Sequence, residues 1–134
     1  MQEFEIDPVL GRDSIEIANL GLCQLRLNND QRWPWLVLVP QRSGLEEIFD
    51  LTPLDQTMLT FETNMAAQAL KKATGATKIN IGALGNIVRQ LHVHVIARFE
   101  GDANWPNSVW GFGSRQAWPD DDRAAIIKKI RDQL

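Results

Sequence analysis

Polar and apolar residues alternate between Gln90 and Val95, in a stretch that continues to Arg98. An alternation with a period of two predicts a β-strand that buries one face. Gln90, His92 and His94 then share the polar face, and the apolar residues between them point into the core. Side chains two residues apart on a strand lie about 6.5–7 Å apart along it. Two imidazoles at this spacing can contact one small ligand from the same side.

Other segments also have strand patterns. Residues 22–27 and 35–39 predict a hairpin, because a polar cluster typical of a turn separates them. The second strand is apolar at both parities, which predicts that both of its faces are covered. Residues 78–83 read as a further strand. Residues 1–20 give weak signals only, an alternation at Ile15 and Ile17 and expected turns at Gly11 and Gly21.

The residues around Thr52 strongly indicate the beginning of a helix. Thr52 can cap the helix, Pro53 fits its first position, and Asp55 favours the positive end of the helix dipole. Gly75 is a typical stop signal. We therefore predict a helix over residues 53–74. Its core-facing stripe is expected to consist of Leu54, Met58, Phe61, Met65 and Ala69.

A second helix is predicted over residues 120–133, because acidic residues begin it and basic residues end it. Residues 45–51 are expected to be a short segment with one helical turn. The long loop 99–113 carries aromatic residues and must pack on its own domain or on a partner subunit. Paired strands and two helices predict a single α+β domain over residues 1–134. The apolar stripe of the second helix is expected to be Ile126, Ile127, Ile130 and Leu134.

Charge and composition exclude several classes of function. The formal charge of −3 argues against binding of nucleic acid polymers or anionic membranes, which needs a basic surface. Cys23 is the one cysteine, so an intrachain disulfide and a paired-cysteine zinc signature are excluded. No apolar run approaches the ~20 residues of a membrane helix, and the first residues lack the pattern of a signal peptide. We therefore expect a cytoplasmic protein.

The two histidines allow three interpretations. They can be half-exposed sheet residues without a role, or metal ligands, although the spacing indicates no third ligand for a catalytic zinc. Alternatively, a neutral imidazole can attack phosphorus and form a covalent intermediate that water resolves, while the second histidine stabilises charge on the phosphate oxygens. The third interpretation fits best, because the neutral amides of Gln90, Asn80 and Asn86 can bind phosphate oxygens without a basic patch. It requires neither a metal nor another cofactor.

Residues 90–96 resemble the signature of the histidine triad (HIT) family, in which three histidines alternate with apolar residues. The similarity extends to residues 35–42, which resemble a family strand that ends in a Val-Pro-x-Arg segment, and to Asn80, Gly85 and Asn86, which resemble its phosphate-binding region. It covers roughly residues 20–112. Membership implies a five-stranded antiparallel sheet, usually a homodimer, and hydrolysis or transfer at the α-phosphate of a nucleotide.

The resemblance also implies roles for individual residues. His92 matches the nucleophilic histidine, and His94 matches the last histidine, which contacts the phosphate. Leu27, Asn28 and Asn29 fall where the family builds part of its nucleoside pocket. Gln90 departs from the pattern, because it replaces the first histidine and cannot shuttle a proton near neutral pH. We therefore expect leaving groups that need little protonation.

Three functions stay open at this point. The chain can be a hydrolase of dinucleoside polyphosphates, such as diadenosine tetraphosphate, or of nucleoside phosphoramidates. It can be a nucleotidyltransferase of the same chemistry, or a nucleotide-binding protein without catalysis. Arg42 and Arg98 are expected to be solvated, although Arg98 shares the parity of His92 and is a candidate phosphate contact. Cys23 is expected to be a buried structural residue.

Overall fold

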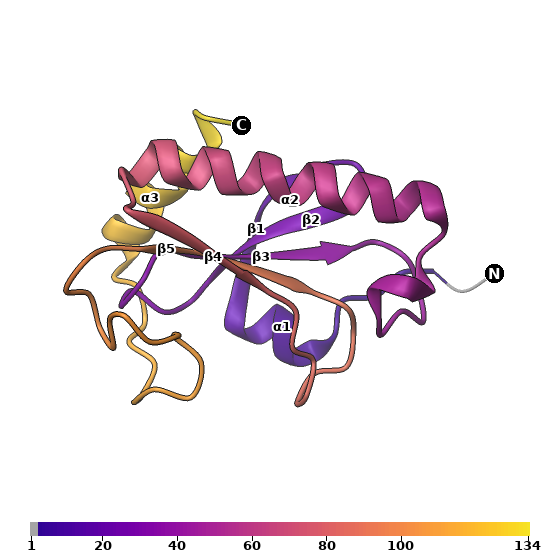
Figure 1. Ribbon diagram of the computed structural model, residues 1–134, viewed down its shortest axis with the longest axis horizontal. Helices are drawn as coiled ribbons and strands as arrows, with labels where there is room; N and C mark the ends of the chain where they lie inside the picture. Colours follow the sequence, from indigo (N-terminus) through magenta and orange to yellow (C-terminus); the bar gives the residue numbers. More distant parts are fainter. Residues whose placement is uncertain (1–2) are drawn as a thin grey trace.

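Five antiparallel strands form one sheet in the order β1-β2-β3-β5-β4 (Figure 1). The structure, a computed structural model, describes residues 3–134. The predicted α+β class and the five-stranded sheet are confirmed. The strands are β1 (Ser14–Asn19), β2 (Cys23–Asn28), β3 (Trp35–Pro40), β4 (Lys78–Gly82) and β5 (Val93–Arg98).

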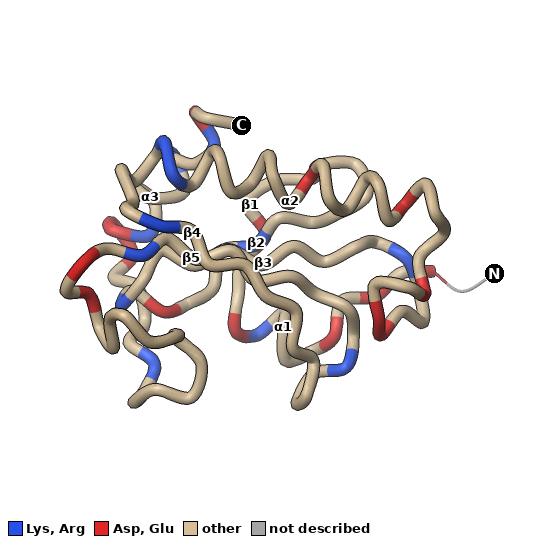
Figure 2. The backbone as a smooth tube through the Cα atoms, viewed as in Figure 1, with Lys and Arg blue, Asp and Glu red and all other residues tan. Residues whose placement is uncertain are grey.

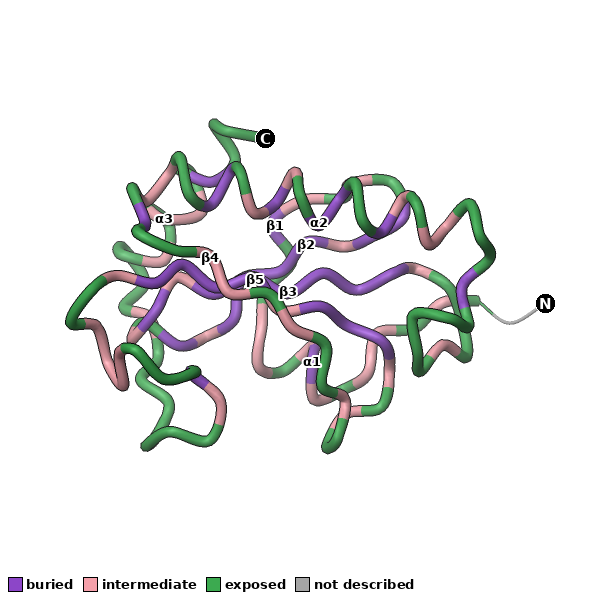
Figure 3. The backbone as a smooth tube through the Cα atoms, in the orientation of Figure 1, coloured by how far each residue is buried: buried purple, intermediate pink, exposed green. Residues whose placement is uncertain are grey.

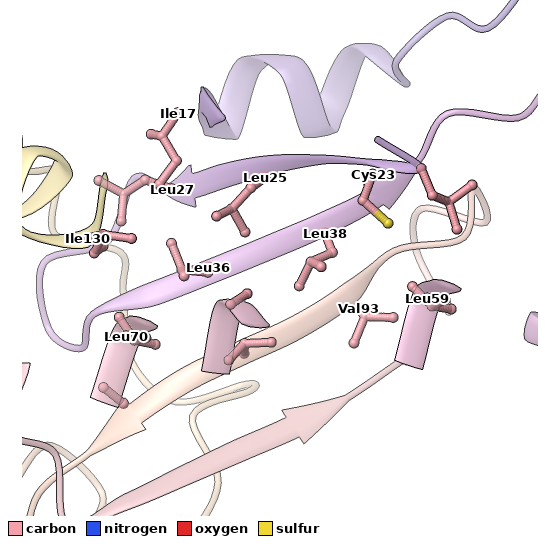
Figure 4. Packing of buried hydrophobic residues seen from close by; sticks show 14 of the residues in the cluster. Ile17, Cys23, Leu25, Leu27, Leu36, Leu38, Leu59, Leu70, Val93 and Ile130 are labelled. Atoms are coloured by element: carbon pink, nitrogen blue, oxygen red, sulfur yellow. The ribbon is translucent and has the colours of Figure 1, made fainter. Parts of the chain in front are cut away.

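Two helices cover one face of the sheet (Figures 1 and 4). The long helix α2 (Pro53–Thr74) begins and ends where predicted, with the Thr52 hydroxyl accepting from the Asp55 N–H and Gly75 in the left-handed region. The C-terminal helix α3 (Asp120–Arg131) adds the buried Ile130, with Ile126 and Ile127 packed partly against the same core. Leu134 lies beyond the helix and is exposed.

The predicted core stripe of α2 was right at Ala69 and partly right at Met58, but wrong at Leu54 and Phe61. Leu54 and Phe61 are 72% and 60% exposed, whereas the sheet is contacted through Leu59, Ala66 and Leu70. Glu62 lies between these residues in the buried stripe, and its carboxylate accepts hydrogen bonds from the backbone N–H groups of residues 22 and 23. A polar residue with such a partner can be buried. The apolar pattern alone therefore included two residues from the exposed side of the helix and missed part of the buried stripe.

The opposite face of the sheet carries a second apolar cluster, formed by Trp33, Trp35, Val37 and Ile96 with neighbours from other elements. Figure 3 shows that β3 is buried along its length, as its two-sided apolar pattern predicted. This face is partly covered by a short helix, α1 (Pro8–Asp13), which contributes Leu10. The expected turn at Gly11 was wrong, because Gly11 lies inside this helix.

Other expectations are confirmed or shifted at their edges. Residues 45–51 contain a single 3₁₀ turn, η1 (Ile48–Asp50). The histidine strand begins at Val93, so Gln90 and His92 precede it. The loop 99–113 packs on its own domain, where Phe112 contacts Trp33 and Trp110 contacts Trp35. Over the described part of the chain, no helix is both long and apolar enough to span a membrane.

Candidate active site

His92 and His94 lie on the side of the sheet that faces away from α2. Val93 and Val95 belong to the core beneath α2, and the alternation of β5 therefore turns His94 to the other face. The two imidazole rings are 4.9 Å apart between centroids. His92 is buried and His94 is half-buried. The pairing of the histidines predicted from their spacing is thus realised in the fold.

The hydrogen bond of His92 defines which of its ring nitrogens is free. Nδ1 lies 2.6 Å from the backbone carbonyl oxygen of Gln90. A carbonyl oxygen can only accept, so Nδ1 carries the proton when the ring is neutral. Nε2 then presents a lone pair, which is the form of imidazole that acts as a nucleophile.

His94 has the opposite arrangement. Its Nδ1 accepts a hydrogen bond of 2.9 Å from the indole Nε1–H of Trp35. An indole N–H can only donate, so the neutral His94 ring carries its proton on Nε2. Burial, with a smaller effect of the neighbouring His92, lowers the pKa of His94 to about 4. His94 is therefore a neutral N–H donor near pH 7.

The histidines line a cleft with a volume of about 500 Å³. One wall is formed by α1 and the start of β1, a second by residues 84–88, and a third by Trp110, Gly111 and Arg115. Asn28, Trp35 and Val37 project from the sheet. Of the residues predicted to bind substrate, Asn28, Gly85 and Asn86 line this cleft. Gly85 has a φ of +77°, a backbone conformation that favours glycine.

Three predicted substrate residues lie away from the cleft. Leu27 is fully buried in the core under α2, because the alternation of β2 turns it to the other face from Asn28 (Figure 4). Asn29 accepts a hydrogen bond from the Trp118 backbone N–H and borders a separate cavity of about 70 Å³. The Asn80 side-chain oxygen accepts from Arg98. These three residues are therefore corrected to structural positions.

The side chain of Gln90 is occupied by the N-terminal segment. Its Oε1 accepts from the backbone N–H of Asp7, and its Nε2 donates to the backbone oxygen of Glu5, both at 2.8 Å. Gln90 does not line the cleft that holds both histidines, although it borders a smaller cavity of about 270 Å³ that His92 also lines. Its backbone, however, orients the His92 ring.

Arg98 is neither solvated nor a phosphate contact, and both expectations for it were wrong. Its side chain is 1% exposed and forms an ion pair of 2.8 Å with Asp102. Burial alone would raise the pKa of Asp102, but hydrogen bonds from Arg98 and the Phe99 N–H lower it. Arg98 also donates to the backbone oxygens of Asn107 and Ala103, and so fixes the loop that leads to Trp110.

Arg42 and Cys23 behave largely as expected. Arg42 is exposed over about half of its side chain and pairs with Asp55 at the start of α2. Cys23 is buried, and burial together with Glu62 raises the pKa of its thiol. Neither residue lines the cleft.

The sequence did not reveal several residues of the cleft. Val9, Leu10, Arg12 and Asp13 come from α1, whose start is signalled by Asp7 and Pro8: the Asp7 carboxylate accepts from the Val9 N–H. The hydrogen bond from Arg12 lowers the pKa of Asp13, and Arg115 pairs with the same carboxylate at 3.0 Å.

Trp110 reaches the cleft from the long loop and packs against His94, with ring centroids 5.5 Å apart. A Cβ atom on Gly82 would lie 2.9 Å from Trp110 Cη2. Gly82 is therefore needed for the position of Trp110. Within residues 3–134, no group of three or more His, Cys, Asp or Glu side chains is arranged to hold a metal ion.

Comparison with known proteins gives close relatives. A HIT domain family model matches residues 12–101. The crystal structure of a histidine triad protein from Sinorhizobium meliloti 1021 is 65% identical, with a TM-score of 0.96 over 98% of this chain and 97% of that chain. A histidine triad protein from Bradyrhizobium japonicum is 39% identical, with a TM-score of 0.97 over 99% of both chains.

A relative with an assigned activity is more distant. The AP-4-A phosphorylase of Mycobacterium tuberculosis strain H37Rv is 34% identical over 82 residues, which are 57% of this chain and 42% of that protein. The chain thus spans less than half of the length of this curated relative.

Proposed function

The chain belongs to the histidine triad family, and on that premise we propose that it is an enzyme that cleaves nucleotides at the α-phosphate through a covalent nucleotidyl-histidine. The observation that carries the proposal is the pair of complementary imidazoles in one cleft. His92 offers an unprotonated Nε2, and His94 offers an N–H group beside it. A nucleophile next to a hydrogen-bond donor for the phosphate oxygens is the arrangement that phosphoryl transfer needs.

The reaction has two steps. His92 Nε2 attacks the α-phosphorus, and the bond to the leaving-group oxygen breaks with its electron pair on that oxygen. Water then attacks the phosphorus of the intermediate and loses a proton to solvent, and Nε2 regains its lone pair. His94 Nε2–H donates to an oxygen of the phosphate group, whose charge grows in both transition states. Gly85, Asn86 and Asn28 line the same cleft, and we assign the first two to the phosphate and Asn28 to the nucleoside sugar.

The environment of the site favours phosphoanhydrides over phosphoramidates as substrates. Both side-chain polar atoms of Gln90 are bound to the N-terminal backbone, and His94 is neutral, so neither supplies a proton to a leaving group. A phosphate leaves as a stable anion, whereas an amine needs a proton as it departs. Dinucleoside polyphosphates such as diadenosine tetraphosphate are therefore the preferred class. Figure 2 shows acidic and basic residues interspersed along the chain, in keeping with a small-molecule substrate rather than a nucleic acid polymer.

A transferase is the second candidate. The phosphorylase name of the Mycobacterium tuberculosis relative favours it. In that reaction inorganic phosphate replaces water in the second step, and diadenosine tetraphosphate gives ADP and ATP instead of AMP and ATP. The two functions share the first step and the same nucleophile.

The test compares diadenosine tetraphosphate with adenosine phosphoramidate, each with and without inorganic phosphate. We expect turnover of the tetraphosphate to exceed that of the phosphoramidate.

His92→Ala should lower turnover on the order of 10³-fold or more while nucleotide binding persists. His94→Ala should lower it by about 10²-fold. Gln68→Ala, on the exposed side of α2, is the matched control. A folded wild type that turns over neither substrate would contradict the proposal.

We also propose that the chain forms a homodimer. The side chains of Leu54 and Phe61 on α2 and of Ile81 on β4 are all at least half exposed, and β4 is an edge strand of the sheet. Ile81 has the same parity as Ile79, which packs on the core beneath α2. An apolar helix face beside an open strand edge is typical of a surface that associates with another chain.

A further inference from the structure

Trp35 and His94 contact each other on the same face of the sheet. They lie on the adjacent strands β3 and β5, where Val37 pairs with His94 and Trp35 pairs with Ile96. Trp35 is therefore the diagonal neighbour of His94 on the same face, close enough for contact between large side chains. Its ring centroid is 5.5 Å from that of His94, and the indole N–H donates to Nδ1.

Two indole rings hold the imidazole of His94 in place. Trp110 packs against it edge to face, with ring centroids 5.5 Å apart, and also contacts Trp35. Only Trp35 forms a hydrogen bond with the His94 ring among the residues described. The orientation of His94 thus results from packing by both tryptophans, whereas its proton position depends on Trp35 alone.

An indole N–H distinguishes between the forms of histidine. The imidazolium carries a proton on Nδ1, and so does the alternative neutral tautomer. Either form would place an N–H group against the N–H of Trp35 at 2.9 Å, with no acceptor between them. The neutral form with its proton on Nε2 is the one form that this contact accepts.

We propose that Trp35 is a positioning residue that fixes His94 in the Nε2–H tautomer, so that a neutral donor and not a lone pair meets the phosphate beside His92. This inference rests on the proposed function, since it assumes that His92 attacks phosphorus. A lone pair on Nε2 of His94 would repel the phosphate oxygens, whereas a fixed donor stabilises their growing charge without reorganisation. The device depends on a residue 59 positions away in the sequence.

The first test reads the tautomer directly in the unaltered protein. The chain has two histidines, so a His92→Ala sample assigns both rings in long-range proton–nitrogen NMR spectra. We expect His94 to show an unprotonated Nδ1 and a protonated Nε2 at pH 7. A protonated Nδ1 would overturn the inference, whether or not the protein turns over a nucleotide.

The second test removes the donor. In Trp35→Phe, and in a variant with the sulfur isostere 3-benzothienylalanine at position 35, we expect a mixture of His94 tautomers and a fall in kcat of about 10–100-fold with little change in KM. The isostere keeps the size of the ring and lacks the N–H group, so it serves if the phenylalanine variant folds poorly.

Trp33→Phe is the matched control. It removes another buried indole donor on the same face, whose partner is the backbone oxygen of Ala103 and not His94. Its kcat should stay within about threefold of the wild type, since no reacting group is touched. A wild type without turnover refutes the proposed function and leaves the tautomer measurement valid. An active isostere variant with wild-type kcat refutes the role of Trp35.

Discussion

The two imidazoles differ because of the groups behind them. A backbone carbonyl faces Nδ1 of His92, and an indole N–H faces Nδ1 of His94. The same residue type therefore presents an unprotonated Nε2 in one case and an Nε2–H donor in the other when both rings are neutral. The hydrogen bonds behind the rings therefore set which nitrogen of each neutral imidazole carries the proton.

His94 should titrate well below the ordinary range for histidine. Burial disfavours the charged ring and lowers its pKa to about 4, whereas an unfolded histidine takes up a proton near 6.5. The unfolded state then binds more protons between these values, so the free energy of unfolding should fall as the pH drops from about 6.5 to about 4. NMR titration of the ring should therefore show most of its change below about pH 5.

The same shift can be checked by stability measurements. His94→Asn removes the titrating group, so its urea unfolding should lack roughly 2–3 kcal/mol of the decrease between pH 7 and pH 4. The pH dependence of stability that the wild type and His94→Asn share comes from the other titrating groups. A midpoint near 6.5 for His94 in the folded protein would contradict the burial argument.

At the residue level, the sequence predicted which side chains share a face but not what they contact. The parity of His94 follows from local alternation, and so did the burial of β3 on both sides. Arg98 shows the limit of prediction from local sequence patterns. Its partners Asp102 and Asn107 lie in a loop whose path has no periodic pattern, so a buried arginine could not be told from a solvated one.

At the level of elements, α1 links the N-terminal segment to the site. It walls the cleft on one side. The segment that leads into it is anchored by two hydrogen bonds of the Gln90 side chain, which accepts from the Asp7 N–H and donates to the Glu5 carbonyl oxygen. The departure from the histidine pattern at position 90 is therefore compatible with catalysis, because this side chain holds a wall of the cleft and does not reach into it.

Gln90→Ala should loosen this wall without unfolding the protein. Loss of two hydrogen bonds, each contributing about 1 kcal/mol, should speed amide hydrogen exchange in residues 7–13. The free energy for exchange in β3 should stay unchanged, and KM should rise several-fold more than kcat falls. Gln68→Ala is the control for loss of an exposed glutamine amide. Uniform faster exchange across the sheet would instead indicate a global role for Gln90.

The ends of α2 were predictable from the sequence, whereas its orientation was not. Capping depends on residues at the ends of the helix, Thr52 and Pro53 at its start and Gly75 at its stop. These are local signals in the sequence. The buried face depends on Glu62, whose partners lie some 40 residues earlier, at the residue before β2 and at its first residue. Likewise, α1 was missed because a helix of six residues has too few positions to show a period.

On the scale of the whole molecule, the two faces of the sheet have separate tasks. The face under α2 and α3 holds the larger apolar core, and the other face holds the cleft and both imidazoles. Leu54 and Phe61, which the sequence predicted to face the core, are exposed instead. This apolar surface is therefore available for a second copy of the chain.

We expect the protein to be a dimer in sedimentation velocity. The double variant Phe61→Glu, Ile81→Glu should weaken the affinity of dimerisation by about 30-fold or more, because each change buries a charge in an apolar interface. Both side chains are at least half exposed in the single chain, so thermal stability of the monomer should change little. Leu134→Glu alters an equally apolar residue, 41% exposed, at the far end of the chain, and should leave the dimer intact. A wild type that sediments as a monomer at high concentration, or a double variant as dimeric as the wild type, would show that this face is not the interface.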